Sequence, residues 1–299
     1  MHITLTGSLG HIGNPLTTRL VAAGHTITVV SSSAGRAEEI TALGAVPAVG
    51  KLQDVDFLSK AFHGAEVVYT MVPPANYFDH NLDLLGYYET VGHNYAEAIR
   101  RAGVQRVVNL SSIGAHLPQG NGILQGTYHV ESILNELSQQ VAVTHIRPTE
   151  FYYNLYAYLT PIKQQGVMGS NLAAQDTNVW VAPTDIAVVV AEEIVTKESI
   201  PKVRYVASDT RTYQEVATAL GKAVGKPDLR WEMISDKQFY ENLKSVGMQP
   251  SIARGMVEMY AAIHSGLLYE DYQQHQPATL GEVKIDDFAR EFAVAYREQ

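Results

Sequence analysis

The sequence predicts an α/β protein built on a Rossmann-type, doubly wound parallel sheet, with a smaller and mainly helical C-terminal domain. Two observations predict this class. Up to about residue 150, short runs rich in Val, Ile and Thr alternate with helical stretches, which is typical of βαβ units. Beyond Pro148 this alternation fades, and most later stretches have the apolar spacing of helices.

Six apolar runs in the first half are the predicted strands. Several contain neighbouring valines, such as Val29-Val30 and Val67-Val68, in place of a strict alternation of apolar and polar residues. Strands that are covered by helices on both faces have such continuous apolar runs. We therefore expect buried parallel strands over residues 3–6, 26–30, 46–49, 67–72, 107–110 and 143–146.

The helices between these strands have recognisable ends. Pro15 is harmless only in an opening turn, so the first helix is expected to begin near Ile12. Asp54 is a suitable N-cap for a later helix. A longer helix over residues 82–101 stops before Gly103, which can adopt the left-handed conformation that ends many helices.

A βα pattern returns late in the chain. The segment Pro183-Thr184-Asp185 is expected to cap a helix over residues 186–195, and a strand over residues 203–207 then rejoins the sheet. Further helices are predicted at 213–224, 236–246, 252–265 and 286–296. We expect one domain of residues 1–150 together with 183–207, and a second of residues 151–182 and 208–299.

Composition narrows the range of functions. The chain has 299 residues, of which 46% are hydrophobic and 18% charged, as in ordinary globular proteins. Because 22 basic and 31 acidic residues give a net charge of −9, direct nucleic-acid binding is disfavoured and a small-molecule ligand is expected. The absence of cysteine excludes disulfides, thiolate metal sites and a cysteine nucleophile. The eleven histidines show no HExxH spacing, so no metal is expected.

Targeting and membrane signals are not found in the sequence. No stretch reaches the ~18 apolar residues that a membrane span requires. Residues 1–5 enter an apolar run with no basic segment before it, so no signal peptide is expected. The sequence therefore favours a cytoplasmic protein that does not contact membranes.

The most informative motif is the turn after the first strand, GSLGHIG at residues 7–13. Glycine lets the backbone turn sharply and approach a pyrophosphate, and the start of the next helix offers free N–H groups to the anion. The glycines are spaced three apart, unlike the two-then-three spacing of the usual dinucleotide fingerprint. We predict a dinucleotide site here, rather than a purely structural turn, with contacts from Gly7, Leu9, Gly10, His11, Ile12 and Gly13.

Residues near the end of the second strand indicate whether the site prefers NAD or NADP. An NAD site usually carries Asp or Glu there, which binds the ribose hydroxyls. This sequence has Ser31 and Ser32 there, with Arg36 close by and no carboxylate. Hydroxyls and a guanidinium suit a 2′-phosphate, so NADP is favoured over NAD. In the alternative interpretation, the serines are turn residues, Arg36 is a solvated helix-start residue, and NAD is accepted as well.

The glycine turn and several later segments resemble a known family. The residues TGSLGHIG at 6–13 are similar to the TGxxGxxG of extended and atypical short-chain dehydrogenases/reductases, and VVNLSS at 107–112 resembles their fifth strand. Residues 129–131, 144–148 and 152–154 resemble the NmrA-like branch, which includes redox sensors of nitrogen regulation and NADPH-dependent quinone oxidoreductases. The resemblance implies that the cofactor passes beside Met71, Val72 and Pro73.

The usual acid–base pair of short-chain dehydrogenases is absent from the region where the family carries it. Those enzymes use Tyr-x-x-x-Lys, in which the lysine lowers the pKa of the tyrosine. Tyr128 is followed four residues later by Ser132, and matching Glu131 to the family's acidic residue places Ile123 and Thr127 at the two positions. An epimerase or classical alcohol dehydrogenase mechanism is therefore disfavoured.

Other residues are candidates for chemistry. The resemblance places His129 where it could relay a proton as the catalytic residue, although a histidine packed on a helix is an equal alternative. Ser111 and Ser112 follow the fifth strand, at the edge where open α/β sheets bind ligands. We expect Ser111 beside the cofactor and Ser112 beside the substrate, with turn formation as the alternative for both.

Aromatic residues gather after two of the predicted strands. Tyr77 follows the fourth strand, and Phe151 and Tyr152 follow the sixth. Such rings could enclose a flat substrate by stacking and by hydrogen bonds from the phenols. Packing between the two domains is the alternative role for each of them.

Two functions follow from these features. The first is an NADP(H)-dependent oxidoreductase that transfers hydride to a quinone-like or carbonyl compound without a Tyr-x-x-x-Lys pair, since an electron-poor ring needs little acid catalysis. The alternative is a non-catalytic NAD(P) sensor of the NmrA type that acts on a regulatory protein partner and binds the two redox forms unequally. The aromatic residues favour the oxidoreductase.

Overall fold

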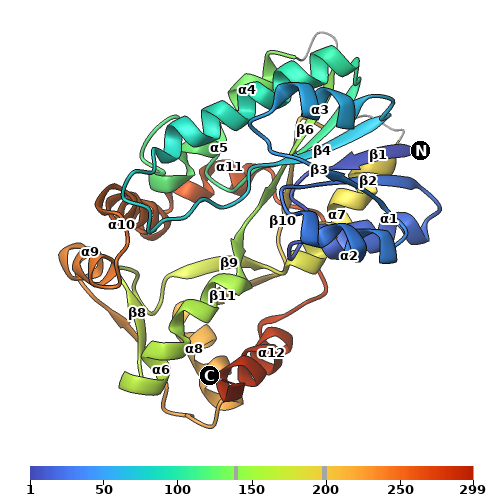
Figure 1. The fold of residues 1–299 in the computed structure, drawn as a ribbon. Helices are drawn as coiled ribbons and strands as arrows, with labels where there is room; N and C mark the ends of the chain where they lie inside the picture. The colour runs from blue at the N-terminus through green and yellow to red at the C-terminus, as the bar shows by residue number, and fades with distance from the viewer. Residues whose placement is uncertain (138–140, 197–200, 299) are drawn as a thin grey trace.

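A seven-stranded parallel sheet forms the centre of the computed structural model, which describes residues 1–137, 141–196 and 201–298 (Figure 1). The strand order is β10-β6-β5-β4-β1-β2-β3, so successive strands are added in one direction from β1 to β3 and in the other from β4 onward. This confirms the predicted doubly wound fold. The strands are β1 (His2–Leu5), β2 (Thr26–Ser31), β3 (Val46–Val49), β4 (Val67–Met71), β5 (Arg106–Leu110), β6 (Ala142–Pro148) and β10 (Val203–Val206).

Helices cover both faces of this sheet. One group packs on one face and a second group on the other, and each face has its own apolar core. The first group is α1 (Gly13–Ala22), α2 (Ala37–Ala42) and α7 (Pro183–Val195). The second group is α3 (Val55–Phe62), α4 (Leu84–Ala102) and α5 (Gln125–Asn135). The short helices η1 (Ala34–Arg36) and η2 (Gly122–Leu124) precede α2 and α5.

The helix ends follow from local chemistry. The Asp54 side chain accepts a hydrogen bond from the backbone N–H of Phe57 and so caps α3, as predicted. Asp83 caps α4 in the same way, and Gly103 ends that helix with a φ of 70°. The first helix begins at Gly13, one residue after its expected start. The cap of α7 is Ala182 and not the predicted Pro183-Thr184-Asp185 segment, because Pro183 already occupies the first turn.

The second half of the chain adds two small sheets and further helices. The predicted strand over residues 203–207 does rejoin the main sheet, where β10 pairs with β6. The sequence does not predict the strands β7 (Glu150–Phe151), β8 (Met168–Ser170), β9 (Thr177–Val181), β11 (Asp209–Thr212) and β12 (Trp231–Met233). They form the sheets β11-β9-β7 and β12-β8.

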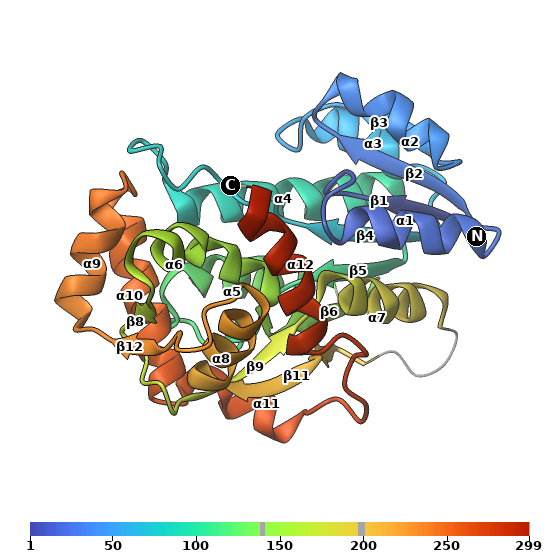
Figure 2. The same cartoon turned by 90° about the horizontal axis from the view of Figure 1, so that it is seen from below.

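Four helices of this half closely match those predicted at 213–224, 236–246, 252–265 and 286–296, but the sequence does not predict the helices over residues 152–165 and 267–274. The helices of this half lie beside the small sheets, with α9 and α10 at the end of the molecule away from the N-terminus (Figure 2). In the described residues, no helix combines the length and the apolar character needed to cross a membrane. The helices are η3 (Tyr152–Tyr158), α6 (Leu159–Gln165), α8 (Tyr213–Ala223), α9 (Asp236–Ser245), α10 (Pro250–His264), η4 (Leu267–Tyr269), α11 (Glu270–Gln274) and α12 (Ile285–Glu298).

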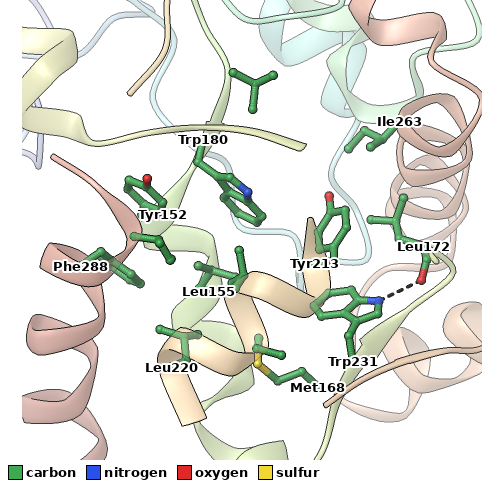
Figure 3. Close-up of a cluster of buried hydrophobic side chains, with 14 of the residues drawn as sticks. Tyr152, Leu155, Met168, Leu172, Trp180, Tyr213, Leu220, Trp231, Ile263 and Phe288 are labelled. Atoms are coloured by element: carbon green, nitrogen blue, oxygen red, sulfur yellow. Dashed lines mark hydrogen bonds between the residues drawn. The ribbon is translucent and has the colours of Figure 1, made fainter. Parts of the chain in front are cut away.

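An aromatic core holds this second half together (Figure 3). Tyr152 is buried between Trp180 and Phe288, with ring centroids 6.0 and 5.3 Å away and nearly parallel rings. The indole N–H of Trp231 donates a 2.8 Å hydrogen bond to the carbonyl of Leu172. Large stacked rings bury much apolar area for little conformational entropy, so this core can fix the small sheets in place.

One buried ion pair ties α7 to the main sheet. The Arg106 guanidinium lies 2.5 Å from the Glu193 carboxylate, and the two side chains are 10% and 3% exposed. Thr144 donates a further hydrogen bond to the same carboxylate, at 3.1 Å. Burial is expensive for either charge alone, so the pair stabilises the fold only while both members are present.

Replacing Glu193 with Ala is expected to destabilise the protein by about 3–5 kcal/mol, because the substitution leaves the Arg106 charge buried and unpaired. Glu192→Ala is the matched control on the same helix, since its partner in an exposed ion pair is Arg204. That control is expected to cost no more than about 1 kcal/mol. Chemical denaturation measures both values, and equal losses would contradict this account of α7.

Candidate functional site

The turn that joins β1 to α1 has a backbone that few sequences could adopt. Gly7 has a φ of +88°, and a Cβ at this residue would lie 2.6 Å from the sulfur of Met71. Ser8 has a φ of +56°, which is the one positive value among the described non-glycine residues. A Cβ at Gly13 would lie 2.0 Å from the carbonyl oxygen of Ser8. Two of the three glycines are therefore required by the path of the chain itself.

Hydrogen bonds hold the start of this turn against β4. Thr6 donates its N–H to Tyr69, and its hydroxyl accepts from the N–H of Met71 at 3.0 Å. The phenol of Tyr95, which is fully buried, lies 2.7 Å from the Met71 carbonyl and 3.2 Å from the Thr6 hydroxyl. Burial raises the pKa of Tyr95, so the phenol keeps its proton for these contacts.

The turn leads into α1, and within the described chain the backbone N–H groups at the start of this helix have no side-chain cap. The N-cap residue of α1 is Ile12. The first N–H groups of a helix lack partners within the helix, and they add to its partial positive charge. Leu9 and Ile12 are buried while Gly10 and His11 are exposed, so the backbone at residues 10 and 11 is accessible. These features fit a diphosphate.

The residues predicted to bind the 2′-phosphate of NADP differ in how accessible they are to a ligand. Ser31 is 2% exposed, and its hydroxyl accepts from the Ser8 hydroxyl at 3.0 Å, so it supports the glycine turn from within. Ser32 is exposed. Arg36 is partly exposed, with its guanidinium 3.3 Å from the Leu9 carbonyl and 3.1 Å from Glu39. Ser32 and Arg36 can therefore reach a ligand, whereas Ser31 is a positioning residue.

A cavity of about 740 Å³ lies beyond the carboxyl ends of β4, β5 and β6, with α10 on its other side. Its surface is mainly aromatic and aliphatic. Three predicted substrate residues, Tyr77, Ser112 and Phe151, line it. The other lining residues are Phe78, Ile113, Ile123, Leu124, Thr149, Glu150, Tyr153, Asn154, Tyr156, Ala157, Met256, Met259, Tyr260, Ile263 and Leu268.

The cavity adjoins the glycine turn. Tyr153 lines the cavity, and its ring centroid lies 4.1 Å from that of His11 in the turn. Tyr77 belongs to the segment after β4, where Gln249 donates its backbone N–H to the Tyr77 carbonyl at 2.9 Å. The phenol of Tyr87 donates to the carbonyl of Pro73 at 3.1 Å, which holds the start of that segment. A ligand on the turn and a ligand in the cavity would therefore lie side by side.

Glu150 is the carboxylic acid of this cavity, and sequence reasoning missed it. Its Oε2 accepts from Asn178 at 2.7 Å and from the phenol of Tyr213 at 3.1 Å. Burial raises the pKa of Glu150 to about 7. Its place two residues after Pro148, at the carboxyl end of a strand, is the signal that could have identified it.

Ser111 takes part in a buried polar network at the end of β5. Its hydroxyl donates to Glu131 at 2.5 Å, and Arg147 binds both oxygens of the same carboxylate, at 2.9 and 2.6 Å. Arg147 also reaches Asp271 at 2.7 Å, as does the phenol of Tyr205. The network ties α11 to β6, so Ser111 has a structural role whichever ligand lies beside it.

Two predicted site residues lie away from the cavity. His129 faces α4, where its Nδ1 is 2.9 Å from a carboxylate oxygen of Glu89, and it is not among the residues that line the cavity. Its role in proton transfer stays a prediction. Tyr152 is wrong as a cavity residue, because its ring is buried in the aromatic core between Trp180 and Phe288. Its neighbours Phe151 and Tyr153 line the cavity instead.

Comparison with known proteins gives a family. The family model described as the NmrA-like family matches residues 1–288 of this chain. Among curated proteins, the chain is similar to the 4-hydroxy-2-methyl-3-oxo-4-farnesyl-3,4-dihydroquinoline-1-oxide ketoreductase of Stigmatella aurantiaca, with 32% identity over 130 residues. That match covers 42% of this chain and 37% of the ketoreductase, so it spans less than half the length of either protein.

Solved structures share the fold at low identity. An NADPH-dependent quinone oxidoreductase from Escherichia coli, complexed with NADPH, is 19% identical and has a TM-score of 0.81, with 97% of this chain and 99% of that chain covered. The triphenylmethane reductase of Citrobacter sp., complexed with NADP(H), is 18% identical and has a TM-score of 0.78, with 98% and 100% covered. At these identities the likeness establishes the architecture.

The geometry of the glycine turn predicts that one Gly→Ala substitution destabilises the protein and that a second one is tolerated. Gly13→Ala is expected to destabilise the protein by about 1–3 kcal/mol, because its Cβ would overlap the Ser8 carbonyl. Gly10→Ala is the matched control, since a Cβ there meets only the Gly7 carbonyl at an ordinary 3.7 Å. Thermal unfolding measures both, and a tolerated Gly13→Ala would contradict the described turn.

Proposed function

Because this chain belongs to the NmrA-like family, we propose that it is an NADP(H)-dependent reductase that transfers hydride to a flat, apolar quinone-like or carbonyl compound. The observation that carries the proposal is the cavity of about 740 Å³ beside the glycine turn. A volume of this size accommodates a small aromatic molecule. Two similar structures, the quinone oxidoreductase and the triphenylmethane reductase, are complexes with NADPH and NADP(H), which supports the choice of cofactor.

The cofactor would lie across the carboxyl edge of the main sheet. In the proposal, the backbone of Gly7, Leu9, Gly10, His11, Ile12 and Gly13 binds its diphosphate, and Ser32 and Arg36 bind its 2′-phosphate. Met71, Val72, Pro73 and Ser111 line its path toward the cavity, with Ser31 supporting the turn. Bound NADPH supplies a hydride, and the protein supplies position and exclusion of water.

The two predicted domains would divide the work. Residues 1–150 with 183–207 would bind the dinucleotide, and residues 151–182 with 208–299 would bind the substrate. This division agrees with the cavity walls, because strand ends of the main sheet form one side and η3, α10 and η4 form the other. Tyr77 and Ser112 would contact the substrate from the first side, and Phe151 would contact it from the second.

We propose a flat substrate because its ring could stack on the aromatic side chains of the cavity. Phe78, Phe151 and several tyrosines surround the cavity, and two methionines of α10 provide adaptable apolar contacts. The relative from Stigmatella aurantiaca is named as a ketoreductase of a farnesylated dihydroquinoline oxide, which carries a ring ketone and an apolar chain. That name supports the substrate class proposed for this chain.

A redox sensor would need the dinucleotide site but no cavity beside it. A sensor acts by binding the two redox forms unequally and by changing its affinity for a partner. Because an apolar cavity of this size has no part in such a device, the cavity favours the reductase. A regulatory protein partner would instead become the leading proposal if no acceptor were reduced.

Arg36→Ala is expected to weaken NADPH binding at least tenfold and to leave NADH binding unchanged, because only NADPH carries the 2′-phosphate. A charged hydrogen bond contributes about 1.5–3 kcal/mol, and about 1.4 kcal/mol corresponds to a tenfold change in Kd. Arg19→Ala, in the last turn of α1, is the control and should change neither Kd. Calorimetric titration measures both, and equal losses for the two dinucleotides would argue against NADP preference at Arg36.

Filling the cavity tests the proposed function directly. Ala157→Trp places an indole in the cavity and should lower kcat/KM for a panel of small quinones at least tenfold, about 1.4 kcal/mol, with no change in the Kd of NADPH. Ala157→Ser is the matched control and should keep most of the activity. Oxidation of NADPH is followed by absorbance. No oxidation by the wild-type protein with any acceptor would overturn the proposal.

A further inference from the structure

We infer that Glu150 is the proton donor to the carbonyl oxygen of the substrate, an inference that rests on the proposed reductase function. At the family position of the Tyr-x-x-x-Lys pair that would otherwise donate this proton, this chain has Tyr128 and Ser132. The same spacing recurs at Tyr240 and Lys244 of α9, but neither residue lines the cavity. Among the described residues that line the cavity, Glu150 alone carries a carboxyl group, and none carries a basic side chain. Glu150 is therefore the acidic residue that a molecule bound there would adjoin.

Three elements outside the main sheet hold the carboxyl group in place. Asn178 of β9 and Tyr213 of α8 both donate to Oε2, and the amide of Asn154 in η3 is a further partner. The orientation of Asn178 is itself determined, because its Oδ1 accepts from the phenol of Tyr269 and its Nδ2 must then face Glu150. Since Oε2 accepts both of these bonds, the proton of the neutral acid belongs on Oε1.

The surroundings of Glu150 raise its pKa, because they bury the carboxyl group among uncharged partners. No ion pair to Glu150 is recorded in the described chain, and the partners that face it are uncharged amides and phenols. Those phenols belong to Tyr158, Tyr213, Tyr260 and Tyr269, and burial raises the pKa of each. Because the pKa of Glu150 is about 7, both protonation states are populated near neutral pH.

A pKa near neutral pH suits a general acid. A donor is most effective when its pKa lies near the working pH, because it is then protonated and still transfers its proton readily. In the step that we infer, a hydride from the reduced nicotinamide bonds to the carbonyl carbon and brings both electrons. The C=O π bond breaks toward oxygen, and that oxygen takes the Glu150 proton to become a hydroxyl. Water then reprotonates the carboxylate.

The same arrangement narrows the substrate class. An electron-poor quinone accepts hydride with little help, whereas an ordinary ketone needs a proton at its oxygen. A dedicated acid in the cavity therefore indicates an uncharged carbonyl compound as the substrate. Anionic substrates are disfavoured, because the ionised carboxylate would repel them inside an apolar cavity.

The experiment compares the wild-type protein with Glu150→Gln, Glu150→Asp and the surface control Glu241→Gln. NADPH is the reductant, and the two acceptors are isatin, a flat carbonyl compound, and 9,10-phenanthrenequinone, a reactive quinone. The kcat/KM for each is measured from about pH 5 to about pH 9. The Gln variant retains an oxygen that accepts from Asn178 and Tyr213, and melting curves verify its fold.

For the wild type, kcat/KM with isatin should be constant below about pH 7 and fall about tenfold per pH unit above it, because the donor must be protonated. Glu150→Gln should be lower by about 10² or more at acidic pH, with no break in the profile. Glu150→Asp should restore the break in part. In both variants, kcat/KM should fall less with the quinone than with isatin. The kcat/KM values of Glu241→Gln should match those of the wild type.

Failures of the two proposals can be distinguished. Unchanged rates and profile in Glu150→Gln would overturn the role of Glu150 and leave the reductase intact. If the wild type reduces the quinone and not isatin, the carbonyl class and the need for a donor are overturned. If the wild type reduces neither acceptor, both the proposed reductase function and the role of Glu150 as proton donor are overturned.

An infrared titration of the protein without cofactor tests the donor independently of turnover. The carbonyl stretching band of a protonated carboxyl should be present at pH 6 and disappear as the pH rises through about 7, and it should be missing in Glu150→Gln. Its absence from the wild type at acidic pH would show an ionised Glu150 and overturn the inference.

Discussion

The rest of the structure depends on the path of the backbone between β1 and α1. Gly7 and Gly13 have no room for a Cβ, and Ser8 holds a positive φ that its hydrogen bond to Ser31 supports. This strained path aims the open end of α1 at the carboxyl edge of the sheet. Arg36 reaches the same turn from η1, which follows β2, and Tyr153 reaches it from the second half of the chain. A residue that displaced the turn would therefore disturb the dinucleotide site and the cavity together.

The second half of the chain contributes a wall to the cavity and also its chemistry. The aromatic core around Tyr152 and Trp180 holds η3 against the small sheets, and the same sheets carry Glu150 and Asn178. Glu150 is thus placed by a rigid core instead of a mobile loop. A buried carboxyl without a counter-ion is costly to ionise, so the packing that builds the cavity also sets the protonation of its acid.

The first half could be predicted because its signals are local. Valine runs, the glycine turn and the caps at Asp54 and Gly103 each act within a few residues, and they gave the parallel sheet and the main edge of the site. The strand β7 has only two residues and does not stand out, and both β7 and β9 pair with residues far apart in sequence. Tyr152 was misplaced because a 3₁₀ helix turns neighbouring side chains about 120° apart, so a run of aromatic residues does not reveal which ring faces the cavity.

A crystal structure of the protein with bound NADPH tests the central claim most directly. The account predicts one dinucleotide per chain, with its diphosphate on the backbone of residues 7–13, its 2′-phosphate beside Arg36 and its nicotinamide at the mouth of the cavity that Glu150 lines. A dinucleotide bound elsewhere, or a crevice that stays closed by side chains at saturating NADPH, would contradict the claim and leave only the architecture standing.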